Sequence, residues 1–253
     1  MLAIDLNCDM GETLAEKTYD LKKDLALLNY VSSVNLACGF HAGDPHTMHK
    51  LVKSAMEKGK AIGAHPGYPD KENFGRLAMP LAPEKIYDII LYQTGALAAF
   101  VQVCGGRLSH VKPHGALYNT ASREKAVADA IARAVFDFDK RIIIYGLSGS
   151  VLIDSAQQLG LRTASEAFAD RRYLADGSLA PRTETNALIE DITDCKQQVL
   201  QMVHEGKVTA LNGLPVAVKA ETICIHGDGN YALPFVQTIY ETLNQHHVII
   251  KQP

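Results

Sequence analysis

The chain has 253 residues, of which 47% are hydrophobic and 21% charged, as is ordinary for a soluble globular protein. Its formal net charge of -3 argues against nucleic acid as a main partner, because phosphate binding needs clustered Lys and Arg. Five cysteines without a Cys-x-x-Cys pair favour neither a disulfide framework nor a zinc knuckle. No basic, apolar leader opens the sequence, and no stretch approaches the roughly 20 apolar residues of a membrane span. We therefore expect a cytoplasmic protein.

Short apolar runs alternate with helical patterns along the whole chain. Strands are predicted over residues 2–7, 33–37, 61–65, 108–113, 141–146, 162–168 and 222–226. Helices are predicted from Pro45 to Gly59, from Pro83 to Gly105, from an N-cap at Ser122 through Val135, from Leu188 to Gly206, and through Ile239 and Leu243. A β-hairpin over residues 208–218 is centred on Asn212-Gly213.

This alternation predicts a mainly parallel sheet with right-handed crossovers. A closed barrel and an open sheet both fit it. The first strand is not followed by Gly-x-Gly-x-x-Gly, which weakens a dinucleotide-binding open sheet. No linker or repeat divides the sequence, so residues 1–253 are expected to form a single α/β domain.

Polar residues cluster just after the predicted strands. In a parallel α/β fold these strand ends meet on one face, where ligands and catalytic groups lie. Each residue also has a structural interpretation. A lone histidine beside glycine is more often a hydrogen-bonded structural residue than a catalyst, but several such histidines at one face point to function. The strand-end histidines are His41, His65, His114 and His226.

The first strand carries Asp5, Asn7 and Asp9, which alternate and therefore face one side. They form either a buried structural network or part of a site. The cysteines near strand ends, Cys8, Cys38 and Cys224, are expected to be small buried hydrophobes. The sequence lacks Gly-x-x-x-x-Gly-Lys-[Ser/Thr], so it does not indicate a Walker-type ATP site.

The strand-end motifs together resemble the LamB/YcsF family. The matching pieces are DLNCDMGE at 5–12, NLACGFHAGD at 35–44, AHPGYPD at 64–70, FGR at 74–76, KPHGALYN at 112–119, EAFADR at 166–171 with Tyr173, and HGD at 226–228. They occur in the family order over nearly the whole chain. One departure is visible: the family commonly has two arginines after Phe-Gly, whereas here Arg76 is followed by Leu77.

The resemblance implies a seven-stranded, TIM-like (β/α) barrel of the deacetylase type. It also implies ATP-dependent hydrolysis of the lactam 5-oxoproline to glutamate, carried out with two partner subunits, B and C. Whether a metal takes part is left open. An unstrained lactam is a poor electrophile, and phosphorylation of its amide oxygen would create a good leaving group.

Such a site needs acid–base groups, donors for developing oxyanions and an anchor for the substrate carboxylate. Catalytic roles are expected for Asp9, His41, His65, Lys112, His114, Glu166 and Asp228, and substrate binding for Asn7, Arg76, Asp170, Arg171 and His226. Arginine is suited to gripping a carboxylate with two hydrogen bonds.

Two other functions remain open. In a metal-dependent, deacetylase-like amide hydrolase, Asp9, His41 and His65 would give a carboxylate and two imidazoles to Zn²⁺ or a similar ion. A non-catalytic chain that scaffolds its partners is the other alternative, although a scaffold does not need so many ionisable groups at its strand ends.

Overall fold

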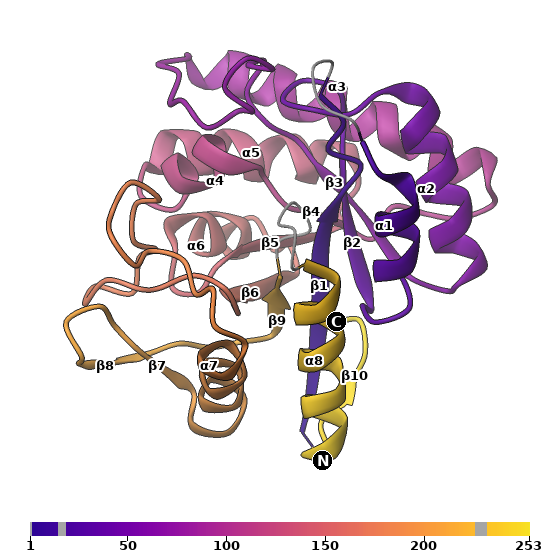
Figure 1. The fold of residues 1–253 in the computed structure, drawn as a ribbon. Coiled ribbons are helices and arrows are strands. Elements are labelled where there is room, and N and C mark those ends of the chain that lie inside the picture. Colours follow the sequence, from indigo (N-terminus) through magenta and orange to yellow (C-terminus); the bar gives the residue numbers. More distant parts are fainter. Residues whose placement is uncertain (1, 15–18, 226–231) are drawn as a thin grey trace.

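Seven parallel strands close into a barrel in the computed structural model, which describes residues 2–14, 19–225 and 232–253 (Figure 1). In barrel order they are β1 (Ala3–Met10), β2 (Ser33–Ala37), β3 (Ala61–His65), β4 (His110–Val111), β5 (Ile143–Leu147), β6 (Thr163–Phe168) and β9 (Thr222–Cys224). Pairing of β9 with both β6 and β1 closes the ring. A short strand, β10 (Ile249–Ile250), adds to the start of β1. The seven-stranded barrel predicted from the sequence is confirmed.

Helices cover the outside of this barrel (Figure 1). They are α1 (Leu21–Leu27), α2 (Pro45–Glu57), α3 (Pro83–Val103), α4 (Gly115–Ala121), α5 (Lys125–Phe138), α6 (Val151–Gln158), α7 (Ile192–Glu205) and α8 (Ala232–Gln245). The predicted N-cap of α2 is confirmed, because the Asp44 carboxylate accepts from the amides of His46 and Thr47. The predicted hairpin is also present, as antiparallel β7 (Lys207–Thr209) and β8 (Pro215–Ala217).

Two predicted helix starts are wrong. Ser122 is the C-cap of the short helix α4, and α5 begins after Glu124. The late helix starts at Ile192 rather than Leu188, because the Asp191 carboxylate caps it there. Leu188 instead forms an isolated antiparallel bridge with Arg171.

Helix α3 is, by length and composition, long and apolar enough to cross a membrane, contrary to the sequence-based expectation. Its 21 residues have a mean hydropathy of 1.3 in the most apolar window. In the fold it lies in the helical ring, with Ile86, Ile90 and Leu97 fully buried. Packing in the core of the domain thus accounts for part of its apolar character, since 33% of that window is buried.

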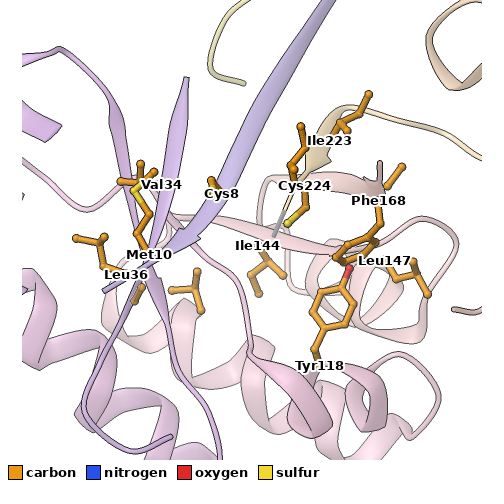
Figure 2. Packing of buried hydrophobic residues seen from close by; sticks show 14 of the residues in the cluster. Cys8, Met10, Val34, Leu36, Tyr118, Ile144, Leu147, Phe168, Ile223 and Cys224 are labelled. Carbon is orange, nitrogen blue, oxygen red and sulfur yellow. The ribbon is translucent and has the colours of Figure 1, made fainter. Parts of the chain in front are cut away.

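The first strand separates an apolar outer layer from a polar interior. Its residues Leu6, Cys8 and Met10 belong to the main hydrophobic core. Figure 2 shows Cys8 and Met10 beside Val34 and Leu36 of β2. The alternate residues of β1 are polar and, since side chains alternate along a strand, they face the barrel axis.

The polar interior begins at Asp5, near the amino ends of the strands. Its carboxylate accepts hydrogen bonds from Ser32, Ser33, Thr222 and Tyr145 at 2.6 to 3.0 Å. Burial nevertheless raises the pKa of Asp5, although these donors counteract part of that effect. For Asp5 the structural interpretation is therefore correct: it joins four segments inside the barrel.

Candidate active site

A cavity of about 520 Å³ opens at the carboxyl ends of the strands. Its lining includes Asp9, Glu12, His65, Arg76, Lys112, His114, Tyr118, Arg123, Phe168, Arg171 and Arg182. Six of these are residues that the sequence assigned to the site, and they come from four strand ends and from the loop that follows β3. The predicted convergence of the polar strand ends on one face is confirmed for the described residues.

Lys112 lies between two carboxylates at the floor of this cavity. Its Nζ is 2.9 Å from Asp9 Oδ1 and 2.9 Å from Glu166 Oε1, and all three side chains are buried. Burial alone would lower the pKa of Lys112, but the attraction of Asp9 and Glu166 outweighs it and holds that pKa well above its usual value. Lys112 is therefore charged, and it provides a fixed positive charge below the cavity.

An amide network sets the position of these charged groups. Asn7 donates to Glu166 Oε1 at 3.0 Å and to the Thr222 hydroxyl at 2.6 Å. Asn35 donates to Asn7 Oδ1 at 2.7 Å and to Asp9 Oδ1 at 2.8 Å. Asn7 thus lies one layer below the cavity, where it orients other side chains. Its predicted contact with substrate stays a prediction.

His110, two residues before Lys112, extends this network. Its Nε2 is 2.7 Å from Asn35 Oδ1, and its ring stacks on Tyr145 with centroids 4.0 Å apart. Burial, reinforced by the charge of Lys112, lowers the pKa of His110 to about 3. The ring is therefore neutral and acts as a hydrogen-bonding group inside the barrel.

Three imidazoles and a carboxylate form a second cluster on the cavity wall. His41, His65 and His114 are buried, and one possible ligand atom from each, with one from Glu12, lie within 4.8 Å of one another. The rings of His41 and His114 stack at a centroid distance of 3.8 Å, and His65 lies edge-on to both. Burial, together with the neighbouring imidazoles, lowers the pKa of both His41 and His114 well below the usual value.

Two glycines allow the chain to pass close to this cluster. A Cβ on Gly67 would lie 2.5 Å from His41 Nδ1, and one on Gly75 would lie 2.7 Å from His41 Cβ. Gly75 also has a φ of +62°, a backbone conformation that side-chain-bearing residues rarely adopt. The glycines of the strand-end motifs therefore make room for the imidazole of His41.

Arginines supply positive charge to the cavity lining. Arg171 is buried and donates to the Ala180 carbonyl at 2.6 Å, while its Nε has no hydrogen-bond partner among the described residues. Burial, with repulsion from Arg182, lowers the pKa of Arg171 to about 10, so the guanidinium remains charged at neutral pH. Leu77, which replaces the family's usual second arginine, is 56% exposed. Arg123 and Arg182 are further cations in the lining.

The remaining predicted residues have different positions. Glu166 lies under the cavity and contacts it through Lys112. Asp170 follows β6 next to Arg171 but is not among the described lining residues. His226 and Asp228 lie outside the described residues. Cys224, expected to be a simple buried hydrophobe, also accepts a hydrogen bond from Lys112 Nζ at 3.1 Å.

Among the ionisable residues of the cavity lining, four were not among the predicted site residues: Glu12, Tyr118, Arg123 and Arg182. Glu12 and Tyr118 lie within matched motifs of the sequence, which is the signal that was available for them. The two arginines stand outside those motifs, and only the folded chain brings them to the cavity.

Comparison with known proteins decides the family. The model of the LamB/YcsF family matches residues 4–253. This chain belongs to the LamB/YcsF family. Among its relatives, the 5-oxoprolinase A subunit of Geobacillus kaustophilus is 51% identical over all of this chain and 98% of its own length. The protein of the same name from Tolumonas auensis is 51% identical over 99% of each chain.

A solved structure in the same family has the same fold. The lactam utilization protein from Thermus thermophilus superposes on this LamB/YcsF chain with a TM-score of 0.90, at 44% identity over 99% of both chains. The barrel is thus also the fold of a protein that is named for lactam utilization.

Proposed function

We propose that this chain is the A subunit of a 5-oxoprolinase and helps to hydrolyse the lactam 5-oxoproline to glutamate. The observation that carries this proposal is the identity of about half of all residues, over essentially the full length, with proteins named as the A subunit of 5-oxoprolinase. The cavity adds independent support, because it combines acid–base groups with cations that suit an anionic substrate.

The anionic end of the substrate is bound by arginines of the cavity lining. Arg171 is buried, charged and has an N–H that points to no described acceptor, so a substrate carboxylate would satisfy it. Arg76 lines the same cavity, close to Phe74, with its guanidinium 4.7 Å from the ring centroid. These two residues would orient the lactam ring toward the strand ends.

Ring opening then takes place over Lys112. Addition of water to the ring carbon increases the negative charge on the lactam oxygen and on any phosphoryl group that it carries, and a preformed cation close to that position lowers the barrier. Asp9 and the pair formed by His65 and His114 are the acid–base groups that line the cavity. One of them must remove a proton from water, and one must deliver a proton to the departing nitrogen.

ATP and subunits B and C complete the reaction in our proposal. The lactam carbonyl is a weak electrophile, and transfer of the γ-phosphoryl group of ATP to its oxygen, with release of ADP, would make the ring carbon reactive. Water then adds to that carbon, the C–N bond breaks as the nitrogen takes up a proton, and a second water releases phosphate from the resulting acyl phosphate to leave glutamate. The four arginines of the cavity suit a phosphorylated intermediate as well as a carboxylate. Since the sequence lacks a Walker-type loop, we assign ATP use to the complex as a whole. We place this complex in the cytoplasm, which the five free cysteines support.

The proposal is tested by measuring glutamate formation from 5-oxoproline and ATP. We expect negligible turnover by the isolated chain and robust turnover with subunits B and C. His114→Ala should reduce the rate of the assembled complex by about 10²- to 10⁴-fold. Lys125→Ala, at a surface ion pair with Asp129, is the matched control and should be fully active. An assembled wild-type complex that forms no glutamate refutes the proposal.

A metal-dependent amide hydrolase is the second candidate, because three imidazoles and a carboxylate converge on the cavity wall. This function predicts hydrolysis of an amide or lactam without ATP. The same assay without nucleotide, with and without added Zn²⁺, separates the two candidates. A scaffold without catalytic residues would instead leave all strand-end variants fully active in the complex.

A further inference from the structure

We propose that Glu12, His41, His65 and His114 bind one divalent transition-metal ion at the wall of the cavity. The ligand atoms are one carboxylate oxygen and one nitrogen from each imidazole. This site differs from the Asp9–His41–His65 set that the sequence offered as an alternative. Asp9 Oδ1 is paired with Lys112, and Asp9 Oδ2 is 3.3 Å from His65 Nε2, but the group of four ligand atoms that lie within 4.8 Å of one another has Glu12 as its carboxylate. The proposal depends on hydrogen-bond geometry and does not require the function proposed above.

Backbone carbonyls fix the proton on two of the rings. His65 Nδ1 is 2.7 Å from the carbonyl oxygen of Lys112, and His114 Nε2 is 2.9 Å from that of Phe74. A carbonyl oxygen can only accept, so these two nitrogens must be the N–H donors. The other nitrogen of each ring, His65 Nε2 or His114 Nδ1, is therefore the one that is available to a metal ion.

These two nitrogens face each other at 3.0 Å, and His65 Nε2 is also 3.3 Å from Asp9 Oδ2. Two bare imidazole nitrogens would repel each other at this distance, so the contact requires a cation, either a shared proton or a metal ion. A ring that donates its second N–H to a backbone carbonyl is the usual arrangement of a metal-binding histidine, because the carbonyl fixes both tautomer and orientation. His65 and His114 both have this arrangement.

His41 is an independent indication of a bound cation. Its side chain is fully buried, and neither ring nitrogen has a hydrogen-bond partner among the described residues. A buried polar group without a partner is costly, typically by about 1–3 kcal/mol. Its Nε2 is 3.7 Å from Glu12 Oε1, and it is thus directed at the same carboxylate that His114 Nδ1 approaches at 3.3 Å. A metal ion would satisfy the imidazole.

The spacing of the ligand atoms suits a four-coordinate ion. Two ligands about 2.1 Å from a tetrahedral metal lie about 3.4 Å apart. The separations here are 3.0 Å between His65 and His114 and 3.3 to 3.9 Å from Glu12 to the three imidazoles. No pair exceeds 4.8 Å, so only small side-chain movements would bring all four onto one ion.

The ligand set indicates which metals fit. Three imidazoles and one carboxylate favour Zn²⁺ or another late first-row ion such as Co²⁺, whereas Mg²⁺ and Ca²⁺ prefer oxygen ligands only. Glu12, His65 and His114 also line the cavity, so the ion would face its contents. If the proposed lactam hydrolysis is correct, water or the amide oxygen of the substrate would reach this ion. His65 and His114 would then be ligands of the ion, and Asp9 would be the acid–base group.

Metal binding can be measured without any turnover. Tag-free chain is stripped with a chelator, dialysed, and titrated with Zn²⁺ by calorimetry and with Co²⁺ by visible absorption. We expect one ion per chain, a four-coordinate Co²⁺ spectrum, and a midpoint of thermal unfolding that rises with Zn²⁺ concentration. Glu12→Gln and His41→Gln should each weaken binding by at least about 100-fold, since loss of outer-shell partners alone costs 10- to 100-fold.

His204→Gln is the matched control, because His204 and His246 form an exposed histidine pair with centroids 5.7 Å apart that could take up metal adventitiously. This variant should bind as the wild type does. The proposal is overturned if folded wild-type chain binds neither ion stoichiometrically, or if both ligand variants, shown to be folded by circular dichroism, retain wild-type affinity. Because no substrate is involved, failure here leaves the lactam hydrolysis assay unaffected.

Discussion

Replacing Lys112 by methionine should destabilise the protein far more than the small change in side-chain volume suggests. The change removes the cation between Asp9 and Glu166 and keeps most of the apolar stem. Both carboxylates are buried, and their side chains are 7% and 0% exposed. Removing one partner of a buried ion pair costs about 3–5 kcal/mol, because the remaining charge stays uncompensated.

For a chain of this size each kcal/mol lowers the midpoint of thermal unfolding by about 2–4 °C, so we expect a loss of roughly 6–20 °C. The charge of Lys112 contributes to the stability of the folded state over the whole neutral pH range. Its folded pKa is raised above the ordinary value of about 10.4, so the contribution is fully present below that pH and disappears only in strong alkali. Urea unfolding at pH 6, 7 and 8 should therefore give the same difference between wild type and variant.

The surface pair of Lys125 and Asp129 is the matched control. Its atoms are closer, at 2.7 Å, but both side chains are more than half exposed, and Lys125→Met should cost at most about 0.5 kcal/mol. A double variant, Lys112→Met with Glu166→Gln, should regain part of the loss, because one of the two buried charges is removed. If Lys112→Met unfolds within about 1 kcal/mol of wild type, the buried-charge argument is wrong.

Three further changes probe other parts of the site. The folded pKa of His110 is about 3 and the unfolded value about 6.5, so the unfolded state binds the extra proton and stability falls as pH drops from 6.5 toward 3. His110→Gln should reduce the slope of the unfolding free energy against pH by about 1.4 kcal/mol per pH unit, as measured by urea unfolding. An unchanged slope would contradict the lowered pKa of His110. Arg171→Met should raise KM for 5-oxoproline in the complex about 10- to 100-fold with a smaller effect on kcat; a pure kcat effect argues against carboxylate binding. Gly67→Ala should displace His41, because the new Cβ would lie 2.5 Å from His41 Nδ1. We expect this variant to have both a lower thermal stability and a lower Zn²⁺ affinity than the wild type. Normal values of both would show that the loop adapts to the added methyl group.

The barrel was predictable because the hydrophobic pattern of the individual strands and helices agrees with their alternation over most of the chain. Buried strands with near-continuous apolar runs and long amphipathic helices with clear caps, such as α2 after Asp44, are visible in sequence. Helices α4 and α6 have only seven and eight residues, which is too short for a periodic pattern to stand out. The start of α7 was misplaced because apolar Leu188 extends the helical pattern, although the chain at that point forms a bridge with Arg171.

The site was predictable to the extent that it lies at strand ends. His65, Lys112 and His114 follow directly from that rule. Glu12 lies in the motif that follows the first strand but was not chosen as a site residue, because only the folded chain shows that the segment after β1 brings it next to the imidazoles. Arg123 and Arg182 belong to loops whose path depends on long-range packing, which no local pattern encodes.

The position of β9 makes assembly of the barrel a late event in synthesis. Thr222 hydrogen-bonds Asp5, which precedes it by 217 residues, and the neighbouring Cys224 contacts Lys112. Until the ribosome has released β9, both β1 and β6 have an unpaired edge, and the polar residues inside the barrel face water. Such long-range pairing is slow, and open sheet edges invite association with other chains. A nascent chain of this protein therefore cannot close its barrel for most of its time on the ribosome. Protection by chaperones should matter more for it than for a barrel that is closed by segments adjacent in sequence.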